Sequence, residues 1–344
     1  MDLQKYNVRT DLAFEAVDGR VLQNQNEVIN EDFDYHNVRI KKTVINQKAA
    51  EELNRKQGCY YLIDISEVDI HDTDSLRIIE DAITKTLKEV LSIEGVNPNS
   101  KGLLVGLGNH NVTPDSLGPM VIENVIVTRH IFELGEEVSE GISNVAAVAP
   151  GVMGNTGIET SDIIQSILEK IDVDFVIAID ALAASQISRV NKTIQITNTG
   201  ISPGSGVGNK RKELSKEVLN IPVIAIGVPT VVDAVTITAN TIDYLLRYFD
   251  KKVKEGPSSS DRLVLSEKID FEETSLPNQE YTEHFLGEFG KLPDNQKASL
   301  INTVLTPNGL NMMVTPKEID VDIADLADVI SSGIDRSLHS IVQP

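Results

Sequence analysis

Two aspartates follow short stretches that could hold them at the edge of a sheet, and together they could activate a water molecule. Asp115 comes after a stretch rich in Gly and Asn, and Asp180 comes directly after the apolar run 175–179. Two neighbouring carboxyl groups do not easily both ionise, so one can stay protonated as a general acid while the other takes a proton from water. Such a pair could hydrolyse a peptide bond without a covalent intermediate.

Each aspartate also has a structural explanation. Asp115 lies in a Thr-Pro-Asp step that is typical of a helix start, where an acidic side chain stabilises the helix N-terminus. Asp180 could be held by backbone amides, or it could bind a ribose in a nucleotide-binding fold. The sequence alone leaves these alternatives open.

Other chemistries have weaker signals. The turn 204–206 lacks the GxSxG frame of a serine nucleophile, and His110 has no evident serine partner. No CxxC or HExxH motif predicts a metal site, and the Gly-rich stretches are neither a Walker A motif nor a full GxGxxG fingerprint. The basic cluster 210–212 could begin a helix or attract acidic residues of a substrate. We therefore expect neither a cofactor nor a resident metal.

The elements that must position the two acids are short apolar runs ending in Gly, Asn or Asp, typical of buried parallel strands. These runs are 103–105, 145–148, 175–179 and 223–226. Because the carboxyl ends of parallel strands meet at one edge of a sheet, the loops that follow should converge on a shared crevice. Gly106, Gly108 and Asn109 lie in the first loop, and Gly151, Gly154 and Asn155 in the second, so we predict that both loops line the site.

Apolar residues at helical spacing predict the helices. One covers 75–93 with Gly95 as its C-cap, others follow the second and fourth strands, and a C-terminal helix carries an apolar stripe from Ile319 to Ile334. The predicted fold is α/β, a three-layer open and mostly parallel sheet with helices on both faces, plus peripheral N-terminal and C-terminal elements. Residues 1–50 are polar, with weak periodicity.

Composition limits the partners. The 344 residues carry 31 Lys and Arg against 52 Asp and Glu, a formal charge of −21, which disfavours direct binding to nucleic acid or anionic membranes. The N-terminus has no signal-peptide pattern, and no run approaches a membrane span. We expect a cytoplasmic protein.

The chain resembles the germination protease family from end to end, most strongly over 102–244. Five motifs carry the resemblance: GLGNHNVTPDSLGP (106–119), APGVMGNTGIETSDII (149–164), FVIAIDALAA (175–184), GISPGSGVGNKRKE (200–213) and IPVIAIGVPTVVDA (221–234). The resemblance implies an aspartic-type endopeptidase, with Asp115 and Asp180 as the catalytic pair, that degrades small acid-soluble spore proteins during germination in the forespore and spore core.

The resemblance also implies a homotetramer, made as an inactive zymogen that loses a short N-terminal segment. Substrates of the family are cleaved between an acidic and an aliphatic residue that is followed by Ala, any residue and Glu. Residues 11–15, Asp-Leu-Ala-Phe-Glu, fit that pattern, so we predict self-cleavage between Asp11 and Leu12. The predicted organisation is a propeptide (1–11), a catalytic core (12–250), a linker (251–263) and a C-terminal helical region packed on the core (264–344).

Two alternatives stay open. The core is similar to that of the hydrogenase maturation proteases, which use equivalent acids around a metal, so a metal-dependent maturation-type peptidase is one of them. The other is a non-enzymatic module that binds phosphate or nucleotide in the Gly-rich crevice. Chelator sensitivity would identify the first, and nucleotide binding would identify the second.

Overall fold

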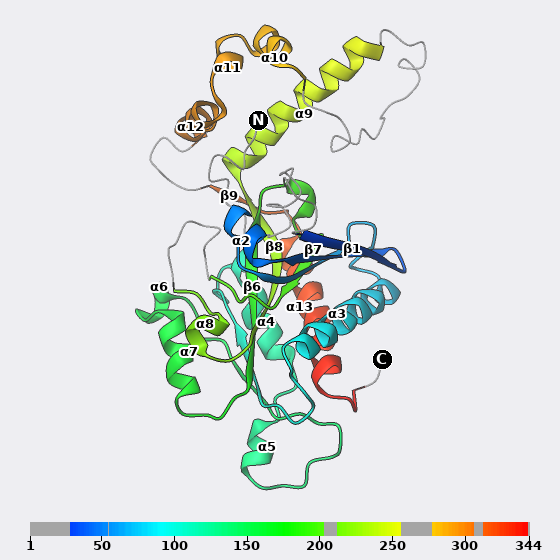
Figure 1. The fold of residues 1–344 in the computed structure, drawn as a ribbon, viewed down its shortest axis with the longest axis vertical. Coiled ribbons are helices and arrows are strands. Elements are labelled where there is room, and N and C mark those ends of the chain that lie inside the picture. The colour runs from blue at the N-terminus through cyan, green and yellow to red at the C-terminus, as the bar shows by residue number, and fades with distance from the viewer. Residues whose placement is uncertain (1–27, 54, 203–211, 256–276, 306–311, 343–344) are drawn as a thin grey trace. The chain divides into compact units, whose positions relative to one another are not determined.

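The computed structural model describes residues 28–53, 55–202, 212–255, 277–305 and 312–342 (Figure 1). The chain forms two compact units. One is built mainly from Val232–Val314 with Ser185–Ile187, and the other from most of the remaining chain. The larger unit contains both predicted catalytic aspartates.

The described part of the chain contains one nine-stranded sheet, in the order β1-β2-β3-β7-β8-β6-β4-β5, with β9 paired to β8. The strands are β1 (Val28–Tyr35), β2 (Val38–Ile45), β3 (Gly58–Asp64), β4 (Gly102–Gly106), β5 (Val145–Val148), β6 (Phe175–Ala184), β7 (Thr193–Thr197), β8 (Val223–Asp233) and β9 (Met313–Val314).

Strand direction divides the sheet. β4 pairs in parallel with both β5 and β6. The neighbouring pairs β1–β2, β2–β3, β3–β7 and β7–β8 are antiparallel. The sheet is therefore mixed: the predicted parallel pairing is found around β4, whereas the pairs from β1 to β8 are antiparallel.

The mixed character comes from strands that the sequence pattern did not reveal. β1 and β2 form a hairpin within a region that reads as polar and weakly periodic. Its two turn residues, His36 and Asn37, both have positive φ (48° and 70°), as a tight two-residue hairpin requires. β2 buries Val38, Ile40 and Ile45, but its two lysines are only half-buried and most of β1 is exposed, which dilutes the apolar signal.

Helices cover both faces of the sheet in the larger unit, as predicted. Alternate residues of a strand point to opposite faces. Leu104 and Ile177 join one cluster with helices α3 (Thr73–Ile93), α4 (Leu117–Asn124) and α13 (Ile319–Leu338). Leu103 and Val176 join another with α7 (Thr160–Leu168) and α8 (Lys216–Leu219). Figure 1 shows α3 and α13 on one side of the strands and α7 and α8 on the other.

Two helices confirm the predictions from periodicity. α3 begins after Asp72, whose carboxylate accepts the Ser75 amide, and Gly95 adopts a left-handed φ of +75° just past its end. In α13 the predicted stripe is buried, and the helix packs against α3 and α4. The remaining short helices of the larger unit are α2 (Gln47–Leu53), η3 (Thr113–Asp115), α5 (Arg129–Glu133) and α6 (Met153–Thr156).

The smaller unit contains α9 (Ala234–Glu255), α10 (Gln279–Leu286), α11 (Glu288–Lys291), α12 (Asp294–Leu305) and β9. The 3-10 turn η4 (Ile187–Arg189) lies at its boundary in the chain. Aromatic rings join its helices: Phe249 of α9 stacks on Phe285 of α10 at 4.9 Å between centroids. The predicted domain boundaries at 11, 250 and 263 stay predictions, and residues 11 and 263 lie outside the described part of the chain.

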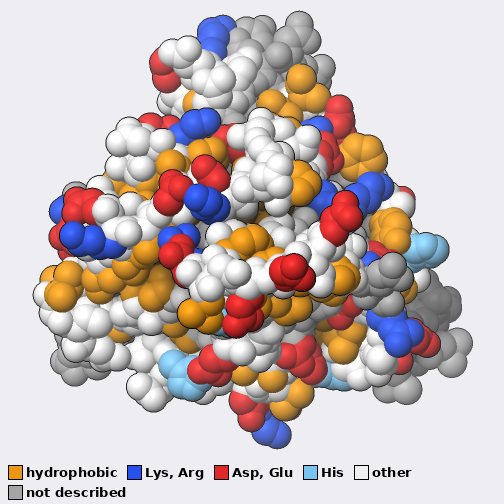
Figure 2. Space-filling view, turned by 90° about the horizontal axis from the view of Figure 1, so that it is seen from below, with side chains coloured by type: hydrophobic (Ala, Val, Ile, Leu, Met, Phe, Trp, Pro, Cys, Tyr) orange, Lys and Arg blue, Asp and Glu red, His pale blue; other side chains and the backbone are white. Residues whose placement is uncertain are grey.

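The face drawn in Figure 2 mixes acidic, basic and apolar side chains without a single dominating patch of one charge. Across the helices that the structure describes, none has the length and apolarity needed to cross a membrane.

Candidate active site

The carboxyl ends of β4, β5 and β6 form one edge of the sheet. Val105 of β4 is in register with Val148 of β5, and Gly106 is in register with Ile179 of β6. Since these strands are parallel, the loops after β4 and β5 leave the sheet at the same level. The two Gly-rich loops therefore start at one edge of the sheet, and the shared crevice between them stays a prediction.

Asp180 lies within β6, immediately beyond its pairing with β4. The strand continues to Ala184, so the prediction that it ends at Asp180 was wrong; the apolar run resumes after the aspartate and keeps an extended conformation. Asp180 is only 5% exposed, and its Oδ1 accepts the Ala181 amide at 3.0 Å. By strand alternation, its side chain is on the same face as Ala178, which packs toward α7 and α8.

Asp115 is half-buried at the end of η3, in a loop that closes on itself. The Asn109 amide donates both to the Asp115 carbonyl at 2.9 Å and to its carboxylate Oδ2 at 2.8 Å. The Asp115 amide in turn donates to the Val112 carbonyl at 2.7 Å. These hydrogen bonds hold the carboxylate against the first residues after β4.

Glycines let the chain pack backbone to backbone at this point. A Cβ on Gly108, whose φ is +112°, would lie 2.0 Å from the Asp115 carbonyl oxygen. A Cβ on Gly106 would lie 2.3 Å from the carbonyl oxygen of Gly118, and one on Gly118 would lie 2.2 Å from that of Leu107. The space beside these glycines is filled by the chain itself, which fixes α4 and η3 directly on the strand ends.

A backbone hydrogen bond joins the loop after β4, which carries Asp115, to strand β6, which carries Asp180. The Leu107 amide donates to the Ile179 carbonyl at 2.7 Å, which extends the pairing of β4 with β6 by one residue. Asp180 follows Ile179, and Asp115 packs on Gly108, which follows Leu107. The structure thus brings both aspartates to the same edge of the sheet from segments far apart in sequence.

Thr230 of β8 contacts the Asp115 loop, and the sequence reasoning missed it. It is fully buried, and its hydroxyl donates to the Pro114 carbonyl at 2.6 Å, next to Asp115. The prediction ended this strand before Gly227, whereas β8 runs to Asp233. A threonine within an otherwise apolar strand was the available signal.

The second predicted loop has a different character. Gly151 has a φ of +73°, and a Cβ there would meet only Thr156 Cγ2, at 3.8 Å. Gly154 has open space around it, and Asn155 is exposed in the short helix α6. The loop lies at the predicted edge, but within the described residues it is packed far more loosely than the loop after β4.

Several predicted residues have no place in the described site. Asp11, Leu12, the turn 204–206 and the first two residues of the basic cluster 210–212 lie outside the described part of the chain. Lys212 is described, and its Nζ pairs with Asp162 at 2.8 Å. His110 lies beside the Asp115 loop and is exposed, 3.6 Å from the carboxylate of Glu123.

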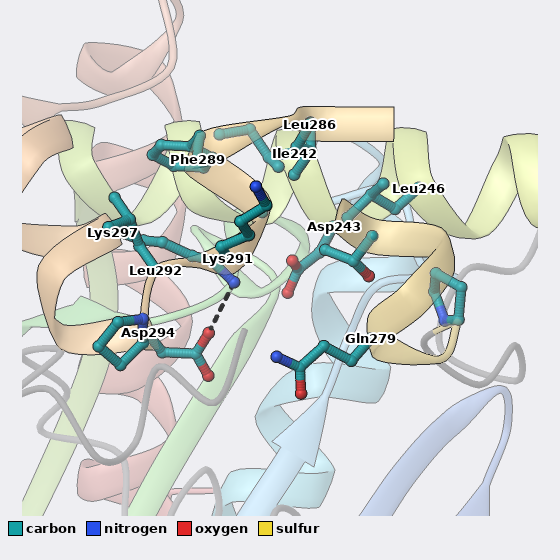
Figure 3. A pocket seen from close by; sticks show the side chains of 14 residues that line it. Ile242, Asp243, Leu246, Gln279, Leu286, Phe289, Lys291, Leu292, Asp294 and Lys297 are labelled. Carbon is teal, nitrogen blue, oxygen red and sulfur yellow. Dashed lines mark hydrogen bonds and ion pairs between the residues drawn. The ribbon is translucent and has the colours of Figure 1, made fainter. Parts of the chain in front are cut away.

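A cavity of about 470 Å³ lies within the smaller unit, among α9 to α12 (Figure 3). Apolar side chains such as Leu246 and Phe289 line it together with Asp243 and the ion pair of Lys297 with Asp294, at 3.3 Å. Burial raises the pKa of the Asp243 carboxyl. None of the predicted site residues lines this cavity. In the described part of the chain, no group of three or more His, Cys, Asp or Glu could hold a metal ion.

Comparison with known proteins identifies the family. The model of the germination protease family matches residues 10–344. The chain belongs to the germination protease family. Two germination proteases, from Bacillus mycoides and Bacillus cereus, are each 50% identical to it, and one from Bacillus thuringiensis is 51% identical; each alignment covers 98% of this chain and 95% of the relative.

Membership confirms the resemblance carried by the five motifs, and it makes the chain a peptidase of the germination protease family. The motif over 106–119 forms β4's last residue, the closed loop and the start of α4, and the motif over 175–184 forms β6. The expected likeness of the core to hydrogenase maturation proteases stays a prediction.

Proposed function

We propose that this germination protease is an aspartic-type endopeptidase that initiates the degradation of small acid-soluble spore proteins during spore germination. Asp115 and Asp180 act on one water molecule: one carboxylate takes its proton as general base, and the other, protonated, donates to the amide leaving group. The metal-dependent and phosphate-binding alternatives have no specific observation in their favour among the described residues.

The observation that carries the proposal is the hydrogen bond from Leu107 to Ile179, because the two acids are anchored on either side of it. Each carboxylate accepts one backbone amide, Asp115 from Asn109 and Asp180 from Ala181, so the proposal lets either acid serve as the base while the other serves as the acid.

The physiological setting follows from the resemblance. The enzyme is made in the forespore as a homotetrameric zymogen, and it becomes active by cutting itself between Asp11 and Leu12. It acts in the spore core, without a cofactor. The sequence Asp-Leu-Ala-Phe-Glu at 11–15 supports a shared specificity for the propeptide and the spore proteins.

Separate Asp115→Asn and Asp180→Asn variants test the mechanism. Each should lower the rate of cleavage of an acid-Leu-Ala-Xaa-Glu peptide by at least about a hundredfold, because either change removes one partner of the proton transfer. Self-processing, followed by intact mass, should stop in the same variants. Asp172→Asn is the matched control, since the carboxylate of this exposed residue pairs with Lys101 at the surface.

Full activity in either aspartate variant would refute the acid pair. The pH profile separates the roles: loss of the base should remove the acidic limb, and loss of the acid the alkaline limb. For the propeptide, a new N-terminus other than Leu12 in the activated enzyme would refute the proposed cleavage site without affecting the mechanism.

A further inference from the structure

The last turn of α13 holds both ends of the segment 126–143, which contains α5 and which we call the α5 excursion. The Asp335 carboxylate accepts the Ile126 amide at 3.0 Å. One turn later, His339 reaches both ends: its Nδ1 is 3.1 Å from the Ser143 amide, and its Nε2 is 3.4 Å from the Ile126 carbonyl. Asp335 therefore holds the start of the excursion, and His339, the C-cap residue of α13, joins its start to its end.

The neighbouring contacts make this junction rigid. The Thr128 hydroxyl donates to the Ser143 carbonyl at 2.5 Å and accepts the Val145 amide at 2.9 Å, and the Ser143 hydroxyl donates to the Leu338 carbonyl at 2.6 Å. Thr128, Ser143 and His339 are all buried, and His339 is only 1% exposed. Since Val145 begins β5, the junction also anchors the strand that leads to the second Gly-rich loop.

These partners require one form of the imidazole. The Ser143 amide can only donate, so Nδ1 must carry a lone pair; the Ile126 carbonyl can only accept, so Nε2 must carry the hydrogen. A protonated ring would set an Nδ1–H against the Ser143 N–H and would bury a charge. Burial lowers the pKa of His339, although the Ile126 carbonyl opposes this shift.

The Asp335 contact responds differently to acid. Burial raises the pKa of this carboxyl to about 6. A carboxylate and a neutral carboxyl both have an oxygen that accepts the Ile126 amide, so this contact survives protonation. Of the two side chains, only His339 has contacts that a proton abolishes.

Other charged groups near this turn are engaged elsewhere. Arg336 pairs with Glu80 and Asp81 of α3, and Asp328 of α13 accepts from Asn124. In the excursion, Arg129 pairs with Glu133, while Glu136, Glu137 and Glu140 add negative charge along the segment. The ring is thus set in a buried polar junction with Asp335 as the charged group one turn away on its own helix.

We propose that His339 is an acid-sensitive clamp, which holds the α5 excursion closed while the imidazole is neutral and releases it when the ring takes up a proton. The clamp is closed at neutral pH and opens below the ordinary histidine pKa of about 6.5. Its working does not depend on the proposed catalytic pair.

Hydrogen exchange of the full-length protein, followed by mass spectrometry at pH 7.5 and pH 5.0, tests the clamp. After correction for the intrinsic exchange rate, protection of the peptide spanning residues 143–145 should fall in acid, by up to about tenfold for each pH unit between the ordinary histidine pKa of about 6.5 and the lowered folded-state pKa of His339. Peptides from the centre of α3 serve as an internal reference and should keep their protection.

Variants distinguish opening of the clamp from a loss of structure that acid causes throughout the protein. Gln at 339 offers an oxygen acceptor and an N–H donor without a titrating group, so His339→Gln should keep the excursion protected at both pH values; His339→Asn is a second variant should glutamine not fit. Asp335→Asn should retain the acid response. An unchanged wild-type profile, a midpoint above pH 6.5, an equal acid response in His339→Gln, or its loss in Asp335→Asn would each overturn the proposal.

Discussion

The loops after β4 and β5 leave the same edge of the sheet on neighbouring parallel strands, yet their glycines have opposite surroundings. In the loop after β4, the missing side chains of Gly106, Gly108 and Gly118 make room for backbone atoms of the chain itself. In the loop after β5, Gly151 has a positive φ and space around it. Gly154 also has open space around it, and its φ is not in the left-handed region.

This difference shows that a Gly-rich loop at a strand end can serve two purposes. The first loop is a rigid support that fixes Asp115 through contacts with β4, β6 and β8. The second is an open segment with space around its glycines. Substitutions of glycines in the two loops should therefore lower the stability of the protein by very different amounts.

The largest effect should come from Gly118→Ala. The new Cβ would lie within 2.2 to 2.7 Å of backbone atoms of Leu107 and Ile179, which cannot move without separating α4 from the sheet. We expect a loss of about 3 kcal/mol or more in the free energy of unfolding, measured with urea, and a parallel loss of peptidase activity. A loss below about 1 kcal/mol would mean that the first loop is not rigid.

A smaller but pH-dependent effect should come from Asp335→Asn, because this carboxylate holds Ile126 at the start of the α5 excursion. Because the folded-state pKa of Asp335 is raised to about 6, its stabilisation is present below the unfolded pKa of about 4 and is lost as pH rises through 6. The variant has no carboxyl group at this position and does not lose this stabilisation. Its free energy of unfolding, relative to that of wild type, should therefore rise by on the order of 2 to 3 kcal/mol between pH 4 and pH 7.

Urea unfolding at several pH values measures this gain. The contribution of His339, whose pKa is lowered, is lost as pH falls below 6.5 in both proteins and so cancels in the difference. A constant difference across the pH range would contradict the burial of an ionisable Asp335.

Thr230→Val tests whether the first loop is supported from β8. The change removes the buried hydroxyl that donates to Pro114 and should cost about 1 to 2 kcal/mol of stability. It should also lower kcat more than it raises KM, because Asp115 loses its support while substrate contacts remain. The control is Thr303→Val, whose exposed hydroxyl bonds only within α12. Equal kinetics for wild type and Thr230→Val would show that this support does not matter.

The smallest effects should separate the two glycines of the open loop. Gly151→Ala should lower the free energy of unfolding by about 1 kcal/mol, because alanine has to adopt a left-handed φ there, although its Cβ would meet no close neighbour. Gly154→Ala should leave stability within about 0.5 kcal/mol of wild type. Thermal unfolding of both variants measures the difference, and a cost at Gly154 similar to that at Gly118 would remove the contrast between the loops.

The sequence predicted the parts of the fold that have strong periodicity. The helix ending at Gly95, the stripe of the C-terminal helix and the four apolar runs all correspond to elements of the structure. The hairpin of β1 and β2 was missed because its outer strand is largely exposed, so no apolar alternation marks it. The ends of β6 and β8 were placed too early because Asp180 and Gly227 interrupt the apolar pattern but not the strand.

By itself the sequence determined the family, through five long motifs, and the types of residue available for chemistry at Asp115 and Asp180. Only the tertiary structure decided that these residues share an edge of the sheet, because strand order and register depend on pairing between distant segments. It also decided that Thr230 supports the Asp115 loop and that His339 joins the ends of the α5 excursion. Each of those contacts joins residues more than a hundred positions apart in the sequence, and no local pattern encodes them.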